Sequence, residues 1–195
     1  NGVTRVRCTD SSFSHILLRL PSAAYMRNFF TATADKQIKE QVMSRIKNLR
    51  EEALAMHKEY QGKIEVRVKA PVRDNDDLTL AYSPGVAEPC MEIHKDPAML
   101  DVYTNHSNFV CVVSNGTAVL GLGSIGAAAA MPVMEGKSLL FKTFGDVDAF
   151  PICVDTKDTG KIVELVELMA PTFGGVNLED IKAPECFVIE DTLKK

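Results

Sequence analysis

The chain has 195 residues, of which 46% are hydrophobic and 25% are charged, and its formal net charge is -4. This amount of apolar material excludes a wholly disordered protein, and the acidic balance gives no reason to expect nucleic acid or anionic lipid as a partner. The five cysteines are widely spaced and form no C-x-x-C pair, which favours reduced thiols over a disulfide framework or a zinc site.

Residues 1–34 have the composition of a leader. They contain four arginines, eight hydroxyl residues and a single acid, Asp10. This composition is typical of an organellar transit peptide and predicts a mitochondrion or a related organelle. A disordered or cloning-derived leader on a cytoplasmic protein is the alternative interpretation.

Residues 35–77 are predicted to form a helical arm, a short strand and a loop. The helix spans 36–60, where apolar residues recur every three or four positions, beginning with Ile38, Val42 and Ile46. Alternation over 64–68 predicts the strand, and the polar segment 70–77 predicts the loop. The apolar stripe of the helix is expected either to pack on its own domain or to contact a second copy in a homodimer or higher homo-oligomer.

The remaining residues, 78–195, predict a compact α/β domain. Strands are expected at 109–113, 138–141, 152–154 and 176–178, and helices at 124–136, 160–169 and 184–195. Strands that alternate with helices predict a three-layer α/β/α architecture with a mostly parallel sheet. Residues 102–134 contain no charged side chain, but Asn115, Gly116 and Pro132 interrupt them, so we expect no membrane span.

A glycine motif, Gly121-Leu122-Gly123-Ser124-Ile125-Gly126, matches the G-x-G-x-x-G fingerprint of dinucleotide-binding folds. Seven residues with their own turn separate it from the strand at 109–113, whereas the fingerprint normally follows its strand directly. A packing turn between helix and sheet is therefore favoured, and a free-standing dinucleotide-binding domain is kept as an alternative.

Four ionisable residues are candidates for chemistry. Tyr82 lies in a Pro- and Gly-containing loop and could act as a proton donor, and Lys137 lies between two apolar segments and could act as a general base. Glu179 and Asp180 follow a predicted strand, where they could bind Mg²⁺ or Mn²⁺. Each also has an ordinary structural explanation, namely packing for the tyrosine, a surface amine for the lysine and helix N-terminal acids for the doublet.

Blocks of sequence from about residue 78 onward resemble the N-terminal substrate domain of malic enzymes, most closely the shorter, prokaryote-type subclass. The blocks are Leu80–Cys90, Val113–Gly126, Pro132–Phe141, Asp148–Pro151 and Pro171–Phe187, in the family's order and spacing. Residues 1–60 carry no comparable resemblance.

The resemblance implies oxidative decarboxylation of L-malate to pyruvate and CO₂ with NAD⁺ or NADP⁺ and a divalent metal. Lys137 would be the base, Tyr82 the proton donor to C3, and Glu179 and Asp180 two of the metal ligands, all lining one cleft. The third ligand and the NAD(P)-binding domain would lie beyond residue 195, so this chain alone is expected to be inactive. A non-catalytic dimerisation fragment remains a further alternative.

Two positions depart from the family's pattern. Asn115 stands where Asp is often found, and Ala118 stands where the larger eukaryotic subclass has a malate-contacting arginine. The contacts to the substrate carboxylates are therefore left open.

Overall fold

The computed structural model describes residues 5–8 and 36–194. The strands are β1 (Arg5–Cys8), β2 (Phe109–Ser114), β3 (Asp148–Cys153) and β4 (Gly175–Leu178). The α-helices are α2 (Lys36–Tyr60), α3 (Asn75–Ala81), α4 (Ala87–Lys95), α5 (Leu100–Tyr103), α6 (Ala127–Gly145), α7 (Thr159–Met169) and α8 (Glu185–Leu193). Two short 3₁₀ helices, η2 (Pro97–Met99) and η3 (His106–Asn108), precede β2.

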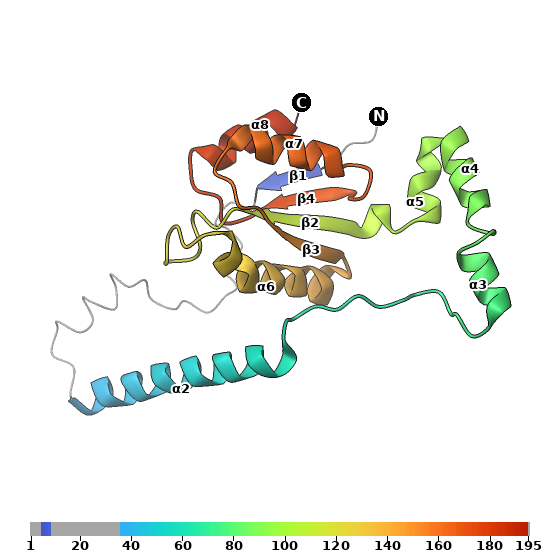
Figure 1. Ribbon diagram of the computed structural model, residues 1–195. Helices are drawn as coiled ribbons and strands as arrows, with labels where there is room; N and C mark the ends of the chain where they lie inside the picture. The colour runs from blue at the N-terminus through green and yellow to red at the C-terminus, as the bar shows by residue number, and fades with distance from the viewer. Residues whose placement is uncertain (1–4, 9–35, 195) are drawn as a thin grey trace.

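The four strands form one parallel sheet in the order β1-β4-β2-β3 (Figure 1). Val113 is paired with Leu178 of β4 and with Ile152 of β3. Helix α6 covers one face of the sheet, and α7 and α8 cover the other. The predicted three-layer α/β/α architecture is confirmed. Since all strands point the same way, the loops that follow them meet at one edge of the sheet.

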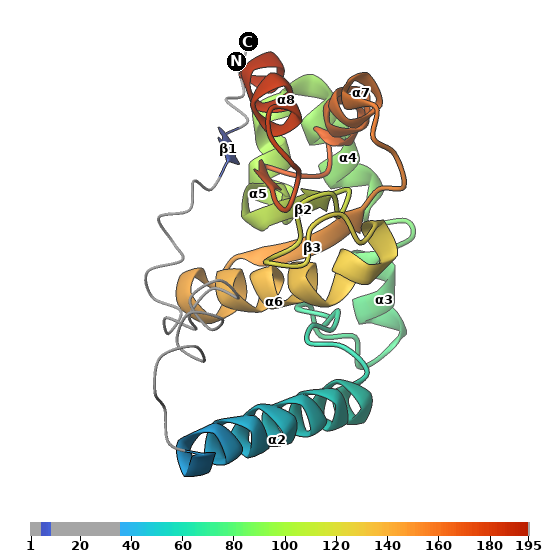
Figure 2. The same cartoon turned by 90° about the vertical axis from the view of Figure 1, so that its left-hand side faces the viewer.

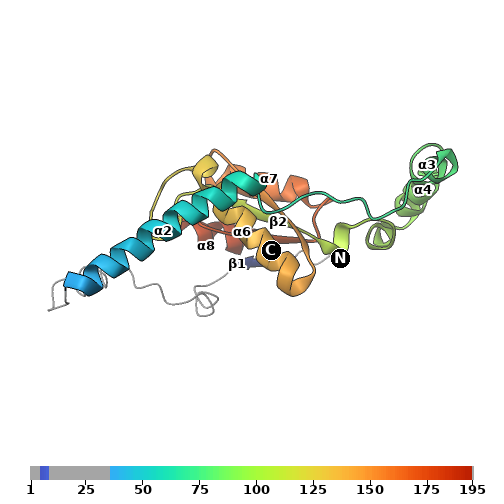
Figure 3. The same cartoon turned by 90° about the horizontal axis from the view of Figure 1, so that it is seen from below.

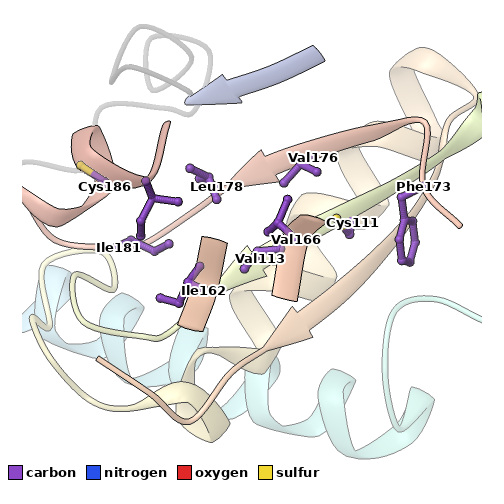
Figure 4. Packing of buried hydrophobic residues seen from close by; sticks show 10 residues of the cluster. Cys111, Val113, Ile162, Val166, Phe173, Val176, Leu178, Ile181 and Cys186 are labelled. Carbon is purple, nitrogen blue, oxygen red and sulfur yellow. The ribbon is translucent and has the colours of Figure 1, made fainter. Parts of the chain in front are cut away.

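The face under α7 and α8 holds the larger hydrophobic cluster (Figure 4). Cys111 and Val113 of β2 point to this side, where Ile162 and Val166 of α7 and Ile189 of α8 meet them. Asp158 caps α7 by accepting hydrogen bonds from the backbone N–H groups of the first turn. The opposite face of β2 presents Val112, which packs with Met134 of α6 and Ala149 of β3. This alternation is the reason β2 reads as a continuous apolar run.

Helix α6 is longer than predicted, and the strand expected at 138–141 is wrong. Proline and glycine destabilise the interior of a helix, so Pro132 and Gly136 favour a helix that ends early. Both residues nevertheless lie inside α6. The helix continues because Ala130, Met134 and Ser138 recur at helical spacing and are all buried against the sheet. As a result, Lys137 lies within a helix rather than at the start of a strand.

In the structure the arm that precedes the sheet extends from Val42 to Asn105, and it departs from the prediction in two places. The strand expected at 64–68 is absent from the structure, where these residues are extended but unpaired, and Val66 and Val68 are exposed. Alternation alone does not make a strand when no neighbouring edge supplies backbone partners. The loop expected at 70–77 ends early, because Asp74 accepts a hydrogen bond from the backbone N–H of Asp77 and caps α3.

Helix α2 has the predicted bounds and lies beyond α6, on the side of α6 away from the sheet (Figure 2). Close to its end, Lys63 donates to the carbonyl oxygen of Pro132 in α6 at 2.9 Å. Farther along, Lys69 lies 3.4 Å from the carboxylate of Asp148 at the start of β3. Helices α3 and α4 then extend past the end of the sheet at which β2 begins (Figure 3).

Within the predicted leader, Arg5–Cys8 form strand β1 beside β4. The other residues of 1–34 lie outside the described part of the chain, so the transit-peptide interpretation stays a prediction. In the ranges that the structure describes, no helix is both long and apolar enough to cross a membrane.

Candidate active site

Lys137 and Glu179 form an ion pair between α6 and the end of β4. The Lys137 Nζ lies 2.8 Å from Glu179 Oε2, and the two side chains are only 20% and 18% exposed. Helix α6 covers one face of the sheet (Figure 1), and the ion pair joins this helix to the residue that follows β4. The partial exclusion of water strengthens the attraction between these two groups.

The position of Glu179 follows from the strand that precedes it. Its backbone N–H donates to the carbonyl oxygen of Val113 at 2.9 Å, which continues the hydrogen-bonded ladder of β4 by one residue. Residues two apart on a strand share a face, so Glu179 points to the same side as Asn177. The Asn177 side chain donates to Glu179 Oε2 at 3.1 Å.

Asp180 lies next to this pair in a left-handed backbone conformation, with φ of 53°. Its carbonyl oxygen accepts the backbone N–H of Ala118 at 3.0 Å, which fixes the loop after β4 against the loop after β2. Its Oδ2 atom is buried and has no hydrogen-bond partner in the described part of the chain. Burial and the neighbouring Glu179 carboxylate raise the pKa of Asp180 to about 6, against the opposing effect of Lys137.

Tyr82 is not brought to these three residues within one copy of the chain. It ends α3, its side chain is 70% exposed, and α3 lies past the end of the sheet at which the strands begin (Figures 1 and 3). Glu179 and Asp180 follow the opposite end of β4. The expected convergence of all four residues in one cleft therefore does not occur within one copy, because the arm carries the tyrosine away from the carboxyl ends of the strands.

The glycine motif lies in the long loop between β2 and α6. Gly123 and Gly126 have positive φ values of 75° and 89°, which explains the glycines there. The close packing that was expected of the motif occurs instead at Gly116, where a Cβ would lie 2.2 Å from the carbonyl oxygen of Gly126. The Asn115 side chain is buried beneath this loop, and its Oδ1 accepts hydrogen bonds from the N–H and hydroxyl of Thr117.

A cleft of about 590 Å³ opens at the start of α6, and its walls include Asn115, Gly126 and Asp155. None of the four predicted site residues lines it. It lies between the loops that follow β2 and β3, whereas Lys137 and the acidic doublet lie between α6 and the end of β4. The ion pair of Lys137 and Glu179 and this cleft are thus neighbouring but different features of one sheet edge.

The two acids carry carboxylate oxygens of the kind that bind a divalent cation, but two side chains do not make a complete ligand set. The described residues contain no group of three or more His, Cys, Asp or Glu side chains placed to hold a metal ion. Mg²⁺ commonly takes only one or two protein carboxylates and fills its remaining positions with other oxygens, so an acidic doublet with an unpaired buried oxygen is compatible with it.

Asn177 is a functional candidate that the sequence interpretation missed. The available signal was a polar residue inside the apolar strand Gly175–Leu178, two positions before an acid. A buried amide needs a hydrogen-bond partner, so its presence in a strand core indicates a specific contact.

The fold and the site together define an α/β domain that presents an amine–carboxylate pair and a second acid at one end of a parallel sheet. Residues 61–194 match the family described as "Malic enzyme, N-terminal domain". The chain therefore belongs to the malic enzyme family and contains its N-terminal domain.

Curated relatives agree with this assignment. A bifunctional malic/malolactic enzyme of Bacillus subtilis is 63% identical over 148 residues, which cover 76% of this chain and 36% of the relative. An NADP-dependent malic enzyme of Escherichia coli is 56% identical over 148 residues, covering 75% of this chain and 20% of the relative. The chain thus spans a fifth to about a third of the length of these bacterial relatives.

Solved structures show the same relationship. A malic enzyme from Pyrococcus horikoshii superimposes with a TM-score of 0.71 at 49% identity, covering 75% of this chain and 35% of that structure. A malic enzyme from Entamoeba histolytica superimposes with a TM-score of 0.76 at 32% identity, and the match covers 96% of this chain and 37% of that structure.

Proposed function

We propose that this chain supplies the catalytic base and two metal ligands for the oxidative decarboxylation of L-malate to pyruvate and CO₂ by NAD⁺ or NADP⁺. The observation that carries the proposal is the 2.8 Å pair of Lys137 and Glu179 beside the buried, unpaired Oδ2 of Asp180. Besides the NADP-dependent enzyme of Escherichia coli, an NAD-dependent malic enzyme of Geobacillus stearothermophilus is 56% identical over 151 residues, which supports a nicotinamide cofactor without choosing between the two.

In this proposal Lys137 accepts the proton of the C2 hydroxyl while hydride leaves C2 for the nicotinamide. In the ion pair with Glu179 the Lys137 side chain is an ammonium, so it must release a proton to solvent before it can accept one. A cation held by Glu179 and Asp180 would favour this release, because it would offset the carboxylate charge that stabilises the ammonium. Mg²⁺ or Mn²⁺, held by Glu179 and Asp180, would supply polarisation of the C2 oxygen and stabilisation of the negative charge that CO₂ loss leaves behind. Tyr82 donates the proton that C3 requires.

Asp180 also sets a pH dependence for cation binding. A carboxylate binds a cation only after losing its proton, and the pKa of Asp180 is raised to about 6. Binding of Mn²⁺ is therefore expected to strengthen as the pH rises through 6 and to weaken below it.

The position of Tyr82 leads us to include a second copy of the chain. The side chain is exposed, and its neighbour Leu80 on the same arm is 75% exposed. Exposed apolar residues gathered on one segment are typical of a surface that contacts a partner. In a two-fold dimer, Tyr82 of one copy would reach the Lys137 and Glu179 pair of the other, so each active site would contain residues of both.

The principal test is Lys137→Ala in the full-length protein, with malate-dependent NAD(P)H formation as the assay. Loss of a general base is expected to lower kcat by about 100-fold to 10,000-fold. Lys142→Ala is the matched control, because Lys142 lies on the same helix but pairs with Asp146 and Asp148. Wild-type turnover by Lys137→Ala would contradict the proposal.

A subunit-mixing experiment tests the shared site. Tyr82→Phe and Lys137→Ala proteins, each inactive alone, are unfolded together and refolded. If Tyr82 acts on the partner's site, about half of the dimers are mixed and each has one intact site, so about a quarter of wild-type activity returns. If each site is built from one chain, no activity returns.

The location of the protein also stays a proposal, in which residues 1–34 direct it to a mitochondrion or related organelle. The two curated relatives described above, from Bacillus subtilis and Escherichia coli, are bacterial. They give this targeting no support and are compatible with the cytoplasmic alternative. N-terminal sequencing of the native protein from fractionated cells tests it, because cleavage near residue 34 is expected only for a transit peptide.

A further inference from the structure

Asn177 is a buried amide in the middle of the sheet. It is 2% exposed and lies between Val176 and Leu178, both of which point into the cluster under α7 and α8. Strand alternation turns Asn177 to the opposite face, where α6 lies and where its strand neighbour Val112 packs with Met134. An amide buried in such surroundings costs free energy unless it is hydrogen-bonded.

The Asn177 amide meets the same carboxylate oxygen as the lysine. Its Nδ2 lies 3.1 Å from Glu179 Oε2, and the Lys137 Nζ lies 2.8 Å from that oxygen. The two donors differ in how firmly they are held. Asn177 has a short side chain on a central strand, whereas Lys137 has a long side chain with four rotatable bonds on a surface helix.

We infer that Asn177 is a positioning residue that holds the Glu179 carboxylate in its metal-binding orientation while Lys137 leaves to accept a proton. This inference rests on the proposed function. When the neutral Lys137 amine turns to the substrate hydroxyl, the contact between its Nζ and Glu179 Oε2 is lost. The Asn177 hydrogen bond remains, so the oxygen keeps its place at the end of β4. Hydrogen bonds to metal-ligating side chains act in this way in other metal sites.

The test is the affinity of the full-length protein for Mn²⁺, measured by the electron paramagnetic resonance signal of the free ion. Asn177→Val removes the donor and leaves a residue that suits a strand. We expect the Kd for Mn²⁺ to rise by about 10-fold to 100-fold, as for other lost contacts to metal ligands. The urea midpoint is expected to stay the same or rise, because the partner carboxylate is partly hydrated and the amide leaves an apolar setting.

Ser138→Ala is the matched control. Ser138 is also buried and lies next to Lys137, but its hydroxyl donates to the carbonyl oxygen of Met134 within α6. The Kd for Mn²⁺ should not change in this variant. If Asn177→Val does not fold, Asn177→Ala replaces it, with the same expected rise in Kd.

An unchanged Kd in a folded Asn177 variant would overturn the inference and leave the proposed function intact. Failure of the unaltered protein to bind Mn²⁺ would contradict the metal step of the proposed function. A crystal structure of the double variant Asn177→Val, Lys137→Ala then decides the inference separately, because the amine no longer contacts Glu179 Oε2. A Glu179 carboxylate in the place it has in Lys137→Ala alone would refute the inference, and a rotated one would support it.

Discussion

The unit from His106 to Leu193 and the arm from Val42 to Asn105 use apolar residues in different ways. Every buried side chain in the described part of the chain lies between Cys111 and Ile189. The arm has helices of similar regularity, yet α3, α4 and α5 bury none of their residues, and Leu49 and Leu54 of α2 are more than half exposed. The unit contains its own core, whereas the arm contains apolar surface that none of the described residues of the same copy covers.

This difference also separates the residues of the proposed active site along the chain. Lys137, Glu179 and Asp180 lie on the packed unit, where strand and helix positions fix their geometry. Tyr82 lies on the arm, where its position depends on what the arm contacts. A second copy that covers the arm would explain both its apolar surface and the distance between Tyr82 and the other site residues.

The largest effect is expected from charging the arm's apolar stripe. Val42→Lys together with Leu49→Lys should weaken dimerisation by about 1,000-fold or more, because two ammonium groups would have to be desolvated in an apolar contact. Sedimentation velocity over a range of protein concentrations measures this. Glu51→Lys introduces the same charge at a position that pairs with Lys47, and it should leave the dimer intact. A dimer that survives both lysines would show that α2 is not the contact.

Truncating one apolar residue in each region should lower the free energy of unfolding in the unit and leave it nearly unchanged in the arm. Ile162→Ala removes a fully buried side chain from the larger cluster and should lower the free energy of unfolding by about 2–5 kcal/mol. Leu80→Ala removes one that is 75% exposed and should change it by less than about 0.5 kcal/mol. Urea unfolding at a concentration where the protein is monomeric provides the comparison. Equal losses would mean that the arm packs on the unit more firmly than it does here.

Low pH should destabilise the contact between the arm and the unit at Asp148, which binds Asn105 of the arm and Lys142 of the unit. Hydrogen bonds from Asn105 and Asn108 and the ion pair with Lys142 hold the pKa of this carboxyl well below its usual range. A carboxyl with a lowered folded pKa stabilises the fold above its unfolded pKa of about 3.9, and this contribution is lost as the pH falls toward the folded value.

We therefore expect Asp148→Asn to be less stable than wild type at pH 7 and to approach it below about pH 4. Thermal unfolding from pH 7 to pH 3 measures the difference. A difference that does not depend on pH would show that the amide disturbs packing rather than charge.

The smallest effect is expected from Lys69→Ala, which removes the ion pair between the arm and Asp148 and leaves the Asn105 hydrogen bond in place. The Lys69 side chain is 70% exposed, and exposed ion pairs contribute about 0–1 kcal/mol. Limited proteolysis of the segment from Lys63 to Arg73 should become slightly faster, while the unfolding midpoint of the unit stays the same. A large drop in that midpoint would contradict the separation of arm and unit.

Much of the packed unit could be predicted from the sequence because its signals are local. The apolar run of β2, the capped α7 and the short β4 appear at nearly the predicted bounds, and their alternation predicts the parallel sheet. Glu179 and Asp180 were recognisable as acids that follow a strand, and the family resemblance named Lys137. Asn177 was missed because nothing in its local pattern shows that its amide meets a carboxylate.

The tertiary structure decided what those local patterns left open. Pro132 and Gly136 are compatible with a helix end, and only the sheet beneath Met134 and Ser138 keeps α6 continuous. The alternation at 64–68 is compatible with a strand, and only the lack of a neighbouring edge leaves it unpaired. Lys137 and Glu179 are 42 residues apart in the chain, so their 2.8 Å contact depends on how α6 crosses the sheet. Sequence periodicity sets which face of an element is apolar, whereas only packing sets which faces meet.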